Sequence, residues 1–279
     1  MKSVNKLQLG IILAAIVLFV LLYFANKKPV KKAEDVVAQT GQSIGTVELK
    51  VFVEAKTAAL NDSLKKKYSE LENAIAKAAD KNAALDSMVK FWDRQMLPDV
   101  ASAYVEKQAE LAKKSTAWFT AGERYYYAVR FVKDVNEVAA LYQRAIHCYS
   151  KGLELEPGSV EAKIRLAACY VEGTADPMKG ISILKEVEKT DSNNVNLQLN
   201  FAMFSAKSQQ WDKAIARFEK VLKLKPDYLE AYLYLADAYE KSGNTEKTIE
   251  ALQKYVDLVP SKDEKKEISK YIEKLKNNH

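Results

Sequence analysis

The residue types that carry most enzyme chemistry are few in this chain and lie far apart. Gly41-Gln-Ser-Ile-Gly45 matches the G-x-S-x-G pattern, in which a serine nucleophile sits on a turn between a strand and a helix. No strand pattern precedes this segment, and His147 and His279 are the only histidines available as a base. An enzyme using this segment stays as an alternative hypothesis, but the missing context predicts a protein without catalytic residues.

The two cysteines give no better candidate for chemistry. Cys148 and Cys169 lie in different helical segments, with no C-x-x-C spacing and no cluster of histidines around them, so no metal site is expected. Both are predicted to be small buried side chains, and a disulfide between them is the alternative if the protein is exported. No phosphate loop or dinucleotide fingerprint is present, so no cofactor is expected.

The positive charge of the chain comes from its N-terminus. Of 43 lysines and arginines, six lie in residues 1–32, where there is no acidic residue, and the rest of the chain holds 37 basic against 37 acidic residues. A neutral body gives no support for a nucleic-acid-binding surface.

Residues 7–25 form a continuous apolar run, broken only by Gln8. As a helix these residues rise about 28 Å, close to the thickness of a bilayer core. Tyr23 and Phe24 do not fit a signal-peptide cleavage site, so we expect a single uncleaved membrane anchor. Four lysines follow the run and are expected to meet lipid headgroups: Lys27, Lys28, Lys31 and Lys32. The short basic tail favours a bacterial inner-membrane protein whose main domain lies in the periplasm, and the lysines after the run favour the opposite orientation.

The chain changes character twice after the anchor. Residues 33–46 lack periodicity and are expected to be a flexible linker. Residues 47–79 are helical in composition, with an interruption at Asn61-Asp-Ser63, so a helical hairpin is expected. Its apolar stripe is expected to pack against the following helices, and dimerisation as a coiled coil is the alternative.

Pro157, Pro226 and Pro260 end similar helical segments, and the last two are 34 residues apart, a repeat period typical of stacked helical pairs. Trp118-x-x-Ala-Gly122-x-x-Tyr125 matches the signature W-x2-L-G-x2-Y except at Ala121. The sequence is therefore divided into an anchor (1–32), linker (33–46), helical hairpin (47–79), degenerate repeat (80–114), extended repeat (115–157), three regular repeats (158–194, 195–226 and 227–260) and a C-terminal capping helix (261–279).

On these motifs the chain resembles the tetratricopeptide-repeat (TPR) family and, in plan, membrane-anchored bacterial TPR proteins. The resemblance implies an all-α fold, a right-handed TPR superhelix (α-solenoid), whose first helices line a concave groove for a peptide or partner helix. Carried over position by position, the groove would present Phe119, Glu123, Tyr126, Tyr127, Arg165, Asn196, Asn200, Met203, Tyr234 and Asp237. Ile164 and Ala168 are expected beside them.

The first repeat with the full signature is too long. Tyr125 and Ala145 are 20 residues apart, whereas the corresponding Tyr239 and Thr248 are 9 apart. Both helices of this repeat are therefore expected to protrude. The added stretch holds residue types that are enriched at interaction hot spots, and core packing of the aromatics is the alternative: Tyr126, Tyr127, Arg130, Phe131 and Arg144.

The best-known ligand of the family is a chaperone C-terminal carboxylate, and of the residues that hold it only Asn200 has a counterpart here. The groove instead suits an amphipathic helix or an extended segment with some basic character. The sequence thus predicts a non-catalytic, membrane-anchored scaffold that binds a protein or peptide partner. A self-associating structural protein, organised by the helices of residues 47–79, is the alternative.

Overall fold

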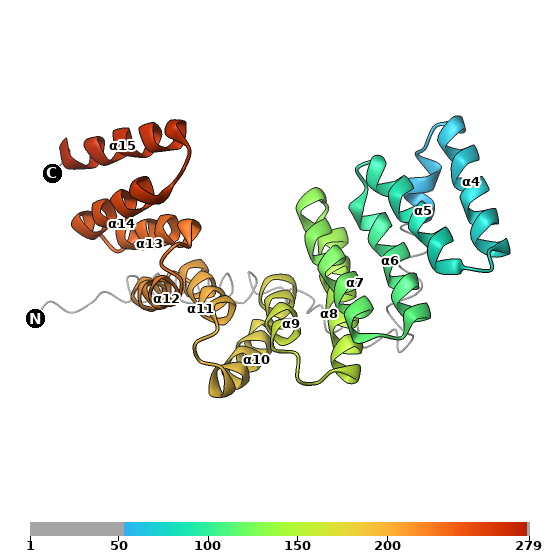
Figure 1. The fold of residues 1–279 in the computed structure, drawn as a ribbon, viewed down its shortest axis with the longest axis horizontal. Helices are drawn as coiled ribbons and strands as arrows, with labels where there is room; N and C mark the ends of the chain where they lie inside the picture. The colour runs from blue at the N-terminus through green and yellow to red at the C-terminus, as the bar shows by residue number, and fades with distance from the viewer. Residues whose placement is uncertain (1–52, 278–279) are drawn as a thin grey trace, which may run out of the picture. The chain divides into compact units, whose positions relative to one another are not determined.

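The computed structural model describes residues 53–277, and within this range the chain forms helices and no strand (Figure 1). A helical segment at 53–58 comes first. The helices that follow are α4 (Asp62–Lys77), α5 (Lys81–Arg94), α6 (Pro98–Ala112), α7 (Ser115–Ala128), the 3₁₀ turn η1 (Val129–Phe131), α8 (Val135–Leu155), α9 (Val160–Gly173), α10 (Pro177–Thr190), α11 (Val195–Lys207), α12 (Trp211–Leu224), α13 (Leu229–Lys241), α14 (Thr245–Leu258) and α15 (Lys262–Asn277).

Several predictions fall outside this range. The predicted anchor at 7–25, the linker at 33–46 and the Gly41–Gly45 motif all precede residue 53. Within residues 53–277, no helix combines the length and the apolar character that a membrane crossing needs.

Helices pack in consecutive pairs, and each predicted repeat range holds one pair. Residues 80–114 hold α5 and α6, residues 115–157 hold α7 and α8, and the next three ranges hold the pairs from α9 to α14. Each helix contacts the next along the chain, and the first helices α7, α9 and α11 also contact one another in sequence. This is the stacking of a helical-repeat array.

The helix before the first pair packs against the array. Asn61 caps α4 by accepting a hydrogen bond from the Leu64 amide at 3.0 Å. The α4 stripe faces α5, where the Tyr68 ring lies 5.6 Å from the Trp92 ring, and the Tyr68 hydroxyl lies 3.2 Å from that of Tyr104. The predicted apolar stripe is therefore covered within the same chain.

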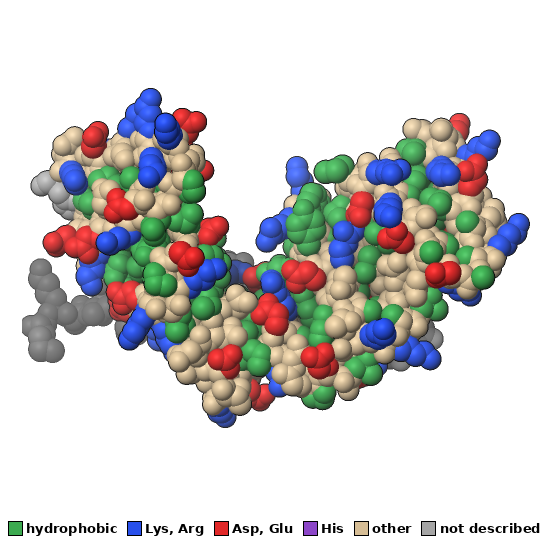
Figure 2. Space-filling model, viewed as in Figure 1, with side chains coloured by type: hydrophobic (Ala, Val, Ile, Leu, Met, Phe, Trp, Pro, Cys, Tyr) green, Lys and Arg blue, Asp and Glu red, His purple; other side chains and the backbone are tan. Residues whose placement is uncertain are grey.

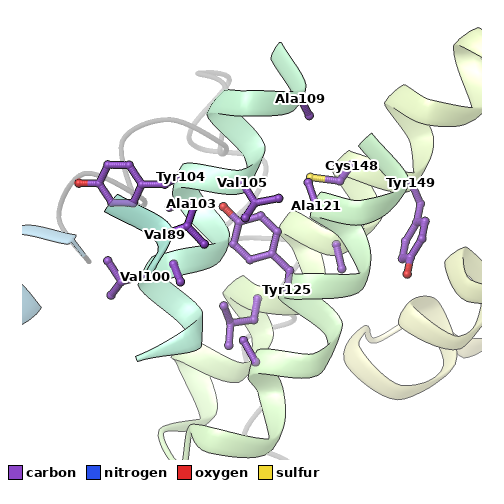
Figure 3. Packing of buried hydrophobic residues seen from close by; sticks show 14 of the residues in the cluster. Val89, Val100, Ala103, Tyr104, Val105, Ala109, Ala121, Tyr125, Cys148 and Tyr149 are labelled. Atoms are coloured by element: carbon purple, nitrogen blue, oxygen red, sulfur yellow. The ribbon is translucent and has the colours of Figure 1, made fainter. Parts of the chain in front are cut away.

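Small residues set the spacing between helices. A Cβ on Gly180 would lie 2.4 Å from the carbonyl oxygen of Ala167, so α10 approaches α9 closely because this residue has no side chain. Large aromatic side chains fill the remaining space, as Figure 3 shows for Tyr125 of α7, which points toward Val105 of α6. The buried hydrophobic residues form three clusters along the described helices, in which small and aromatic side chains pack together.

The extended repeat differs from its prediction in one respect. α7 has 14 residues, the same as α9, whereas α8 has 21. The added residues form η1, the turn after it and the start of α8. The prediction that both helices are longer is therefore wrong for α7, because the chain leaves the α-helix at Val129 and restarts at the Asp134 cap.

Charges of both signs are interspersed on the face shown in Figure 2. This agrees with the balance of 37 basic and 37 acidic residues after the N-terminal lysines. Many of the acids accept hydrogen bonds from tyrosines of a neighbouring helix, as Glu264 does from Tyr255 at 2.6 Å. That contact raises the pKa of Tyr255 to about 12.

Candidate functional site

A pocket of about 350 Å³ opens between α7 and α9 and holds three of the predicted groove residues, Phe119, Glu123 and Arg165. Its other lining residues are Thr120, Arg124, Tyr149, Ser159, Glu161 and Ala162. These side chains come from the first helices of two successive pairs, from α8, and from the cap of α9. The pocket therefore lies where the repeat motif predicts ligand contact.

A chain of polar contacts crosses this surface from α8 to α11. Tyr149 donates its hydroxyl proton to Glu123 Oε2 at 2.9 Å, and the same oxygen lies 3.6 Å from Arg165 Nε. Arg165 Nε donates to Glu161 Oε1 at 3.0 Å. Asn196 Nδ2 in turn donates to Glu161 Oε2 at 3.0 Å. We call these five residues the polar chain; it holds the side chains of α7, α9 and α11 in fixed relative positions.

The electrostatics of the polar chain keep Arg165 charged and Tyr149 protonated. Burial opposes the charge of Arg165, but the neighbouring Glu123 and Glu161 carboxylates outweigh it and raise the pKa of the guanidinium. Burial, together with Glu123, also raises the pKa of the Tyr149 hydroxyl. Tyr149 therefore remains a proton donor, and the two half-exposed carboxylates keep capacity to accept hydrogen bonds from a ligand.

Phe119 forms the apolar wall of the pocket. Its ring lies against Gly152 of α8, where a Cβ would come within 2.3 Å of the ring. Gly152 thus permits Phe119 to seat between the helices and remain partly exposed. An aromatic wall beside two carboxylates offers a place for a side chain with an apolar stem and a positive end.

The two neighbouring tyrosines differ in environment. Tyr126 donates to Glu172 Oε2 at 3.0 Å, and Tyr142 donates to the same oxygen at 3.0 Å. Burial and Glu172 raise the pKa of Tyr126, so its hydroxyl is committed to joining α7, α8 and α9. Tyr127 is exposed and packs on Phe131, with ring centres 5.1 Å apart.

The remaining predicted groove residues lie further along the array and are less organised. Asn200 Nδ2 donates to the backbone carbonyl of Asn196 at 2.8 Å. Met203 and Tyr234 are exposed at 39% and 40%, and the Tyr234 ring stacks on Phe218 at 5.8 Å. Asp237 is exposed. No polar contact links α11 to Tyr234 or Asp237 among the described residues, so the polar chain ends at Asn196.

Three sequence-based expectations are corrected. Ile164 and Ala168 do not face a groove: they are 1% and 4% exposed, because α9 is flanked by α7, α8, α10 and α11. Arg144, expected as a surface hot spot, is largely buried and forms an ion pair with Glu106 at 3.2 Å.

Glu161 was not among the predicted groove residues, although it joins Arg165 to Asn196 in the polar chain. Its signal is present in the sequence, because Glu161 lies four residues before Arg165 and an acid and a base at that spacing share one helix face. Gly152 was also missed, since its effect depends on the position of Phe119 in another helix.

Among the described residues, those that could do chemistry form neither a disulfide nor a metal site. Cys148 and Cys169 are both buried and unpaired, and burial raises the pKa of each thiol. Within residues 53–277 no group of His, Cys, Asp and Glu has the arrangement of a metal site. His147 lies 3.8 Å from the buried Glu106 and edge-on to Trp118.

The geometry defines a helical-repeat protein, and the comparison with solved structures gives the class. A tetratricopeptide repeat protein from Parabacteroides merdae superposes with a TM-score of 0.54 at 15% identity, covering 82% of this chain and 88% of that chain. YrrB, a TPR protein with an unusual peptide-binding site, superposes with a TM-score of 0.43 at 20% identity, covering 72% of this chain and 97% of that chain. The superposition on the Parabacteroides merdae protein shows that residues 53–277 form an all-helical, TPR-like solenoid.

Sequence comparisons match parts of the chain. A family model described as regulator of microtubule dynamics protein 1-3 matches residues 200–278. Superkiller protein 3 of Schizosaccharomyces pombe is 25% identical over 171 residues, which cover 59% of this chain. The matched segment spans only 11% of that much longer relative.

Proposed function

We propose that this protein is a membrane-anchored scaffold that binds a peptide segment or helix of a partner protein and performs no chemistry of its own. The observation that carries this proposal is the pocket between α7 and α9, with Phe119, Glu123 and Arg165 on its walls. The polar chain supports it further, because side chains that are already held in place lose less conformational entropy when a ligand binds.

The ligand that fits best has an apolar side chain next to a basic one. Phe119 supplies the apolar contact, and Glu123 and Glu161 supply half-exposed carboxylates on either side of Arg165. Asn196 and Asn200 extend the surface with amide groups that suit the backbone of an extended peptide. YrrB is described as having a peptide-binding site, and the proposal for this chain rests on its own pocket.

The membrane part of the proposal rests on the sequence. Residues 7–25 are proposed as a single-pass anchor, with Lys27, Lys28, Lys31 and Lys32 at the lipid headgroups. We place the protein in a bacterial inner membrane with the array in the periplasm, where it would assist a membrane or envelope complex. Homo-oligomers are compatible with this arrangement.

A cross-linking experiment on the full chain tests the scaffold. A photoreactive phenylalanine analogue is placed at Phe119 and, in a matched control, at the exposed Lys223 on the second helix α12. Membranes that contain the protein are irradiated, and the cross-linked products are identified. A defined product from Phe119 that is absent from the Lys223 control, and lost when Arg165 is replaced by alanine, is the expected result.

The same products at both positions, or a product that survives Arg165→Ala together with Asn200→Ala and Tyr234→Ala, would argue against binding at this surface. Fractionation of the membranes before irradiation tests the anchor separately. The wild-type chain is expected in the membrane pellet after alkaline extraction, and a variant without residues 7–25 in the supernatant.

A further inference from the structure

Two neighbouring turns carry an unusual number of exposed hydrophobic side chains. Met96 in the α5–α6 turn is 69% exposed, and Tyr127, Phe131 and Val135 around the α7–α8 turn are 45%, 45% and 78% exposed. Figure 2 shows hydrophobic side chains gathered at the end of the α7–α8 hairpin, with blue lysine and arginine side chains around them. In a folded domain, exposed hydrophobic clusters of this kind mark interaction sites.

The two turns lie side by side at one edge of the array. Lys56 Nζ is 3.9 Å from Asp99 Oδ2 in the first turn of α6 and 3.4 Å from Glu137 Oε1 in the first turn of α8. One lysine side chain therefore spans the beginnings of both helices, each of which directly follows its turn.

The charge available at this edge is positive. Arg94, Arg130 and Lys133 are exposed, and within residues 53–277 none of them forms an ion pair, although Arg130 lies over the Tyr127 ring at 5.8 Å. Two of the acids of these turns are ion-paired, and Asp134 serves as the N-cap of α8. Asp93 pairs with Arg124, Asp134 accepts the amides of Asn136 and Glu137, and Glu137 pairs with Lys56.

The described chain also begins at this edge. The segment 53–58, which contains Lys56, directly follows the residues that lead from the proposed anchor. Residues 26–52, if fully extended, reach at most about 90 Å, so this segment permits the edge to approach the bilayer without forcing it to do so. The composition of the edge must therefore supply the attraction.

We propose that this turn surface, made of Met96, Tyr127, Phe131, Val135, Arg94, Arg130 and Lys133, docks on the anionic lipid surface of the membrane that holds the anchor. Aromatic and aliphatic side chains enter the headgroup boundary, and the cations meet lipid phosphates. The inference rests on the proposed membrane attachment. Phe119 precedes Tyr127 by eight residues, about 12 Å along α7, so docking holds the candidate pocket above the headgroups.

The charges favour lipid over a second copy of the chain. A symmetric contact through this surface would bring Arg94, Arg130 and Lys133 of two chains together, three cations per chain against the one carboxylate, Asp134, that has no ion pair among the described residues. Like charges across a contact are destabilising, whereas an anionic bilayer complements the same set.

The test uses the full chain in lipid vesicles, with an environment-sensitive dye on a cysteine that replaces Val135. The matched control carries the dye at Leu155, which is 55% exposed at the opposite end of the same helix, about 30 Å away. The native Cys148 and Cys169 are buried, so the dye reacts at the new thiol. In vesicles that contain phosphatidylglycerol, dye emission is expected to shift to the blue and to be quenched by nitroxide lipids at 135 and not at 155.

The charge requirement is tested with Arg130→Glu plus Lys133→Glu, against Lys254→Glu plus Lys266→Glu, two exposed lysines of α14 and α15. Each cation near an anionic surface contributes roughly fivefold to partitioning. The first pair is expected to lower the quenched fraction at 135 by at least that factor per residue, and the second pair to leave it unchanged.

Three outcomes would overturn the inference. Flotation with the vesicles without quenching at 135 rejects docking while the anchor stands. A blue shift in detergent that grows with protein concentration assigns the surface to a second copy. A chain that does not float rejects the proposed anchoring and the docking with it.

Discussion

Two ion pairs in this array have the same topology and opposite character. Glu106 of α6 pairs with Arg144 of α8, and Glu188 of α10 pairs with Arg217 of α12. Each joins the second helix of one pair to the second helix of the next. The side chains of Glu106 and Arg144 are 3% and 12% exposed, and those of Glu188 and Arg217 are 30% and 31%.

The difference in burial reverses the effect on the carboxyl group. Desolvation raises the pKa of Glu106 despite Arg144 and the hydrogen bond from Tyr125 at 2.7 Å. A hydrogen bond from Arg217 lowers the pKa of Glu188. Ion pairs at equivalent places in a repeat array therefore contribute differently to stability, because desolvation outweighs attraction at the buried pair.

The largest effect is expected when the buried pair is broken. Glu106→Ala leaves the Arg144 charge and the Tyr125 hydroxyl without their acceptor, and should lower the free energy of unfolding by about 3–5 kcal/mol. Glu188→Ala breaks a half-exposed pair and should cost less than about 1 kcal/mol. Urea unfolding of both variants, followed by circular dichroism in the same detergent, measures the difference. Equal losses would show that burial does not distinguish the two pairs.

Around α10, close helix packing should contribute more to stability than the Glu188–Arg217 ion pair. Gly180→Ala places a methyl group against the Ala167 carbonyl and within 2.7 Å of Val171 Cγ2. Because a backbone atom cannot move aside without shifting α9, the expected cost is about 1–3 kcal/mol. Gly158→Ala is the matched control, since no atom lies within 4 Å of its Cβ position. A Gly180→Ala variant as stable as the Gly158→Ala control would contradict the close approach of α9 and α10.

The stability contributions of Glu106 and Glu188 should change with pH in opposite directions. Glu106 has a raised pKa in the folded state, so its contribution is fully present below the ordinary value of 4.5 and is lost as pH rises through the folded pKa. Glu188 has a lowered pKa, so its contribution is present above 4.5 and is lost as pH falls through the folded pKa.

Glu106→Gln and Glu188→Gln measure these contributions. The stability advantage of wild type over Glu106→Gln should shrink as pH rises above about 4.5, and its advantage over Glu188→Gln should shrink as pH falls below it. Thermal unfolding at a series of pH values reports both. If both stability differences changed with pH in the same direction, burial would be rejected as the cause of the opposite pKa shifts.

The regular helix pairs could be predicted from the sequence, whereas the buried Glu106–Arg144 ion pair could not. The period between Pro226 and Pro260, with small residues at fixed positions, specifies helices that stack. Glu106 and Arg144 are 38 residues apart, which is not the repeat period, so no pattern relates them. The added length of the extended repeat could be predicted from the sequence. Its distribution between α7 and α8 could not, because a residue count does not show which helix is longer.

The candidate site, too, could be predicted only in part. Glu123 and Arg165 follow from motif positions, and they line one pocket. Ile164 precedes Arg165 directly but faces a different neighbour, because a helix turns about 100° per residue and α9 has helices on several sides. The added length of the extended repeat pointed to Tyr127, Arg130 and Phe131 of the turn surface. No pattern pointed to Met96, because its exposure depends on which helices cover it.

The smallest effect is expected at a turn that lacks the closing proline. Asp191 and Lys225 each accept a hydrogen bond in their turns, from Asn194 at 3.3 Å and from Tyr228 at 3.2 Å. Their backbone angles also agree, with φ of −143° and −139°. Ser192 therefore occupies the place of Pro226. At this position Gln198 and Lys220 both donate to the Ser192 carbonyl at 2.7 Å.

Ser192→Pro should raise the free energy of unfolding by about 0.4–1 kcal/mol, because proline restricts the unfolded chain and fits the second position of such a turn. The carbonyl that Gln198 and Lys220 hold is kept. Urea unfolding beside Asn193→Pro, which places proline one position later where it is disfavoured, measures the effect. A loss of stability in Ser192→Pro equal to that in Asn193→Pro would show that side-chain contacts, and not the shared turn geometry, fix the junction beside the Glu188–Arg217 pair.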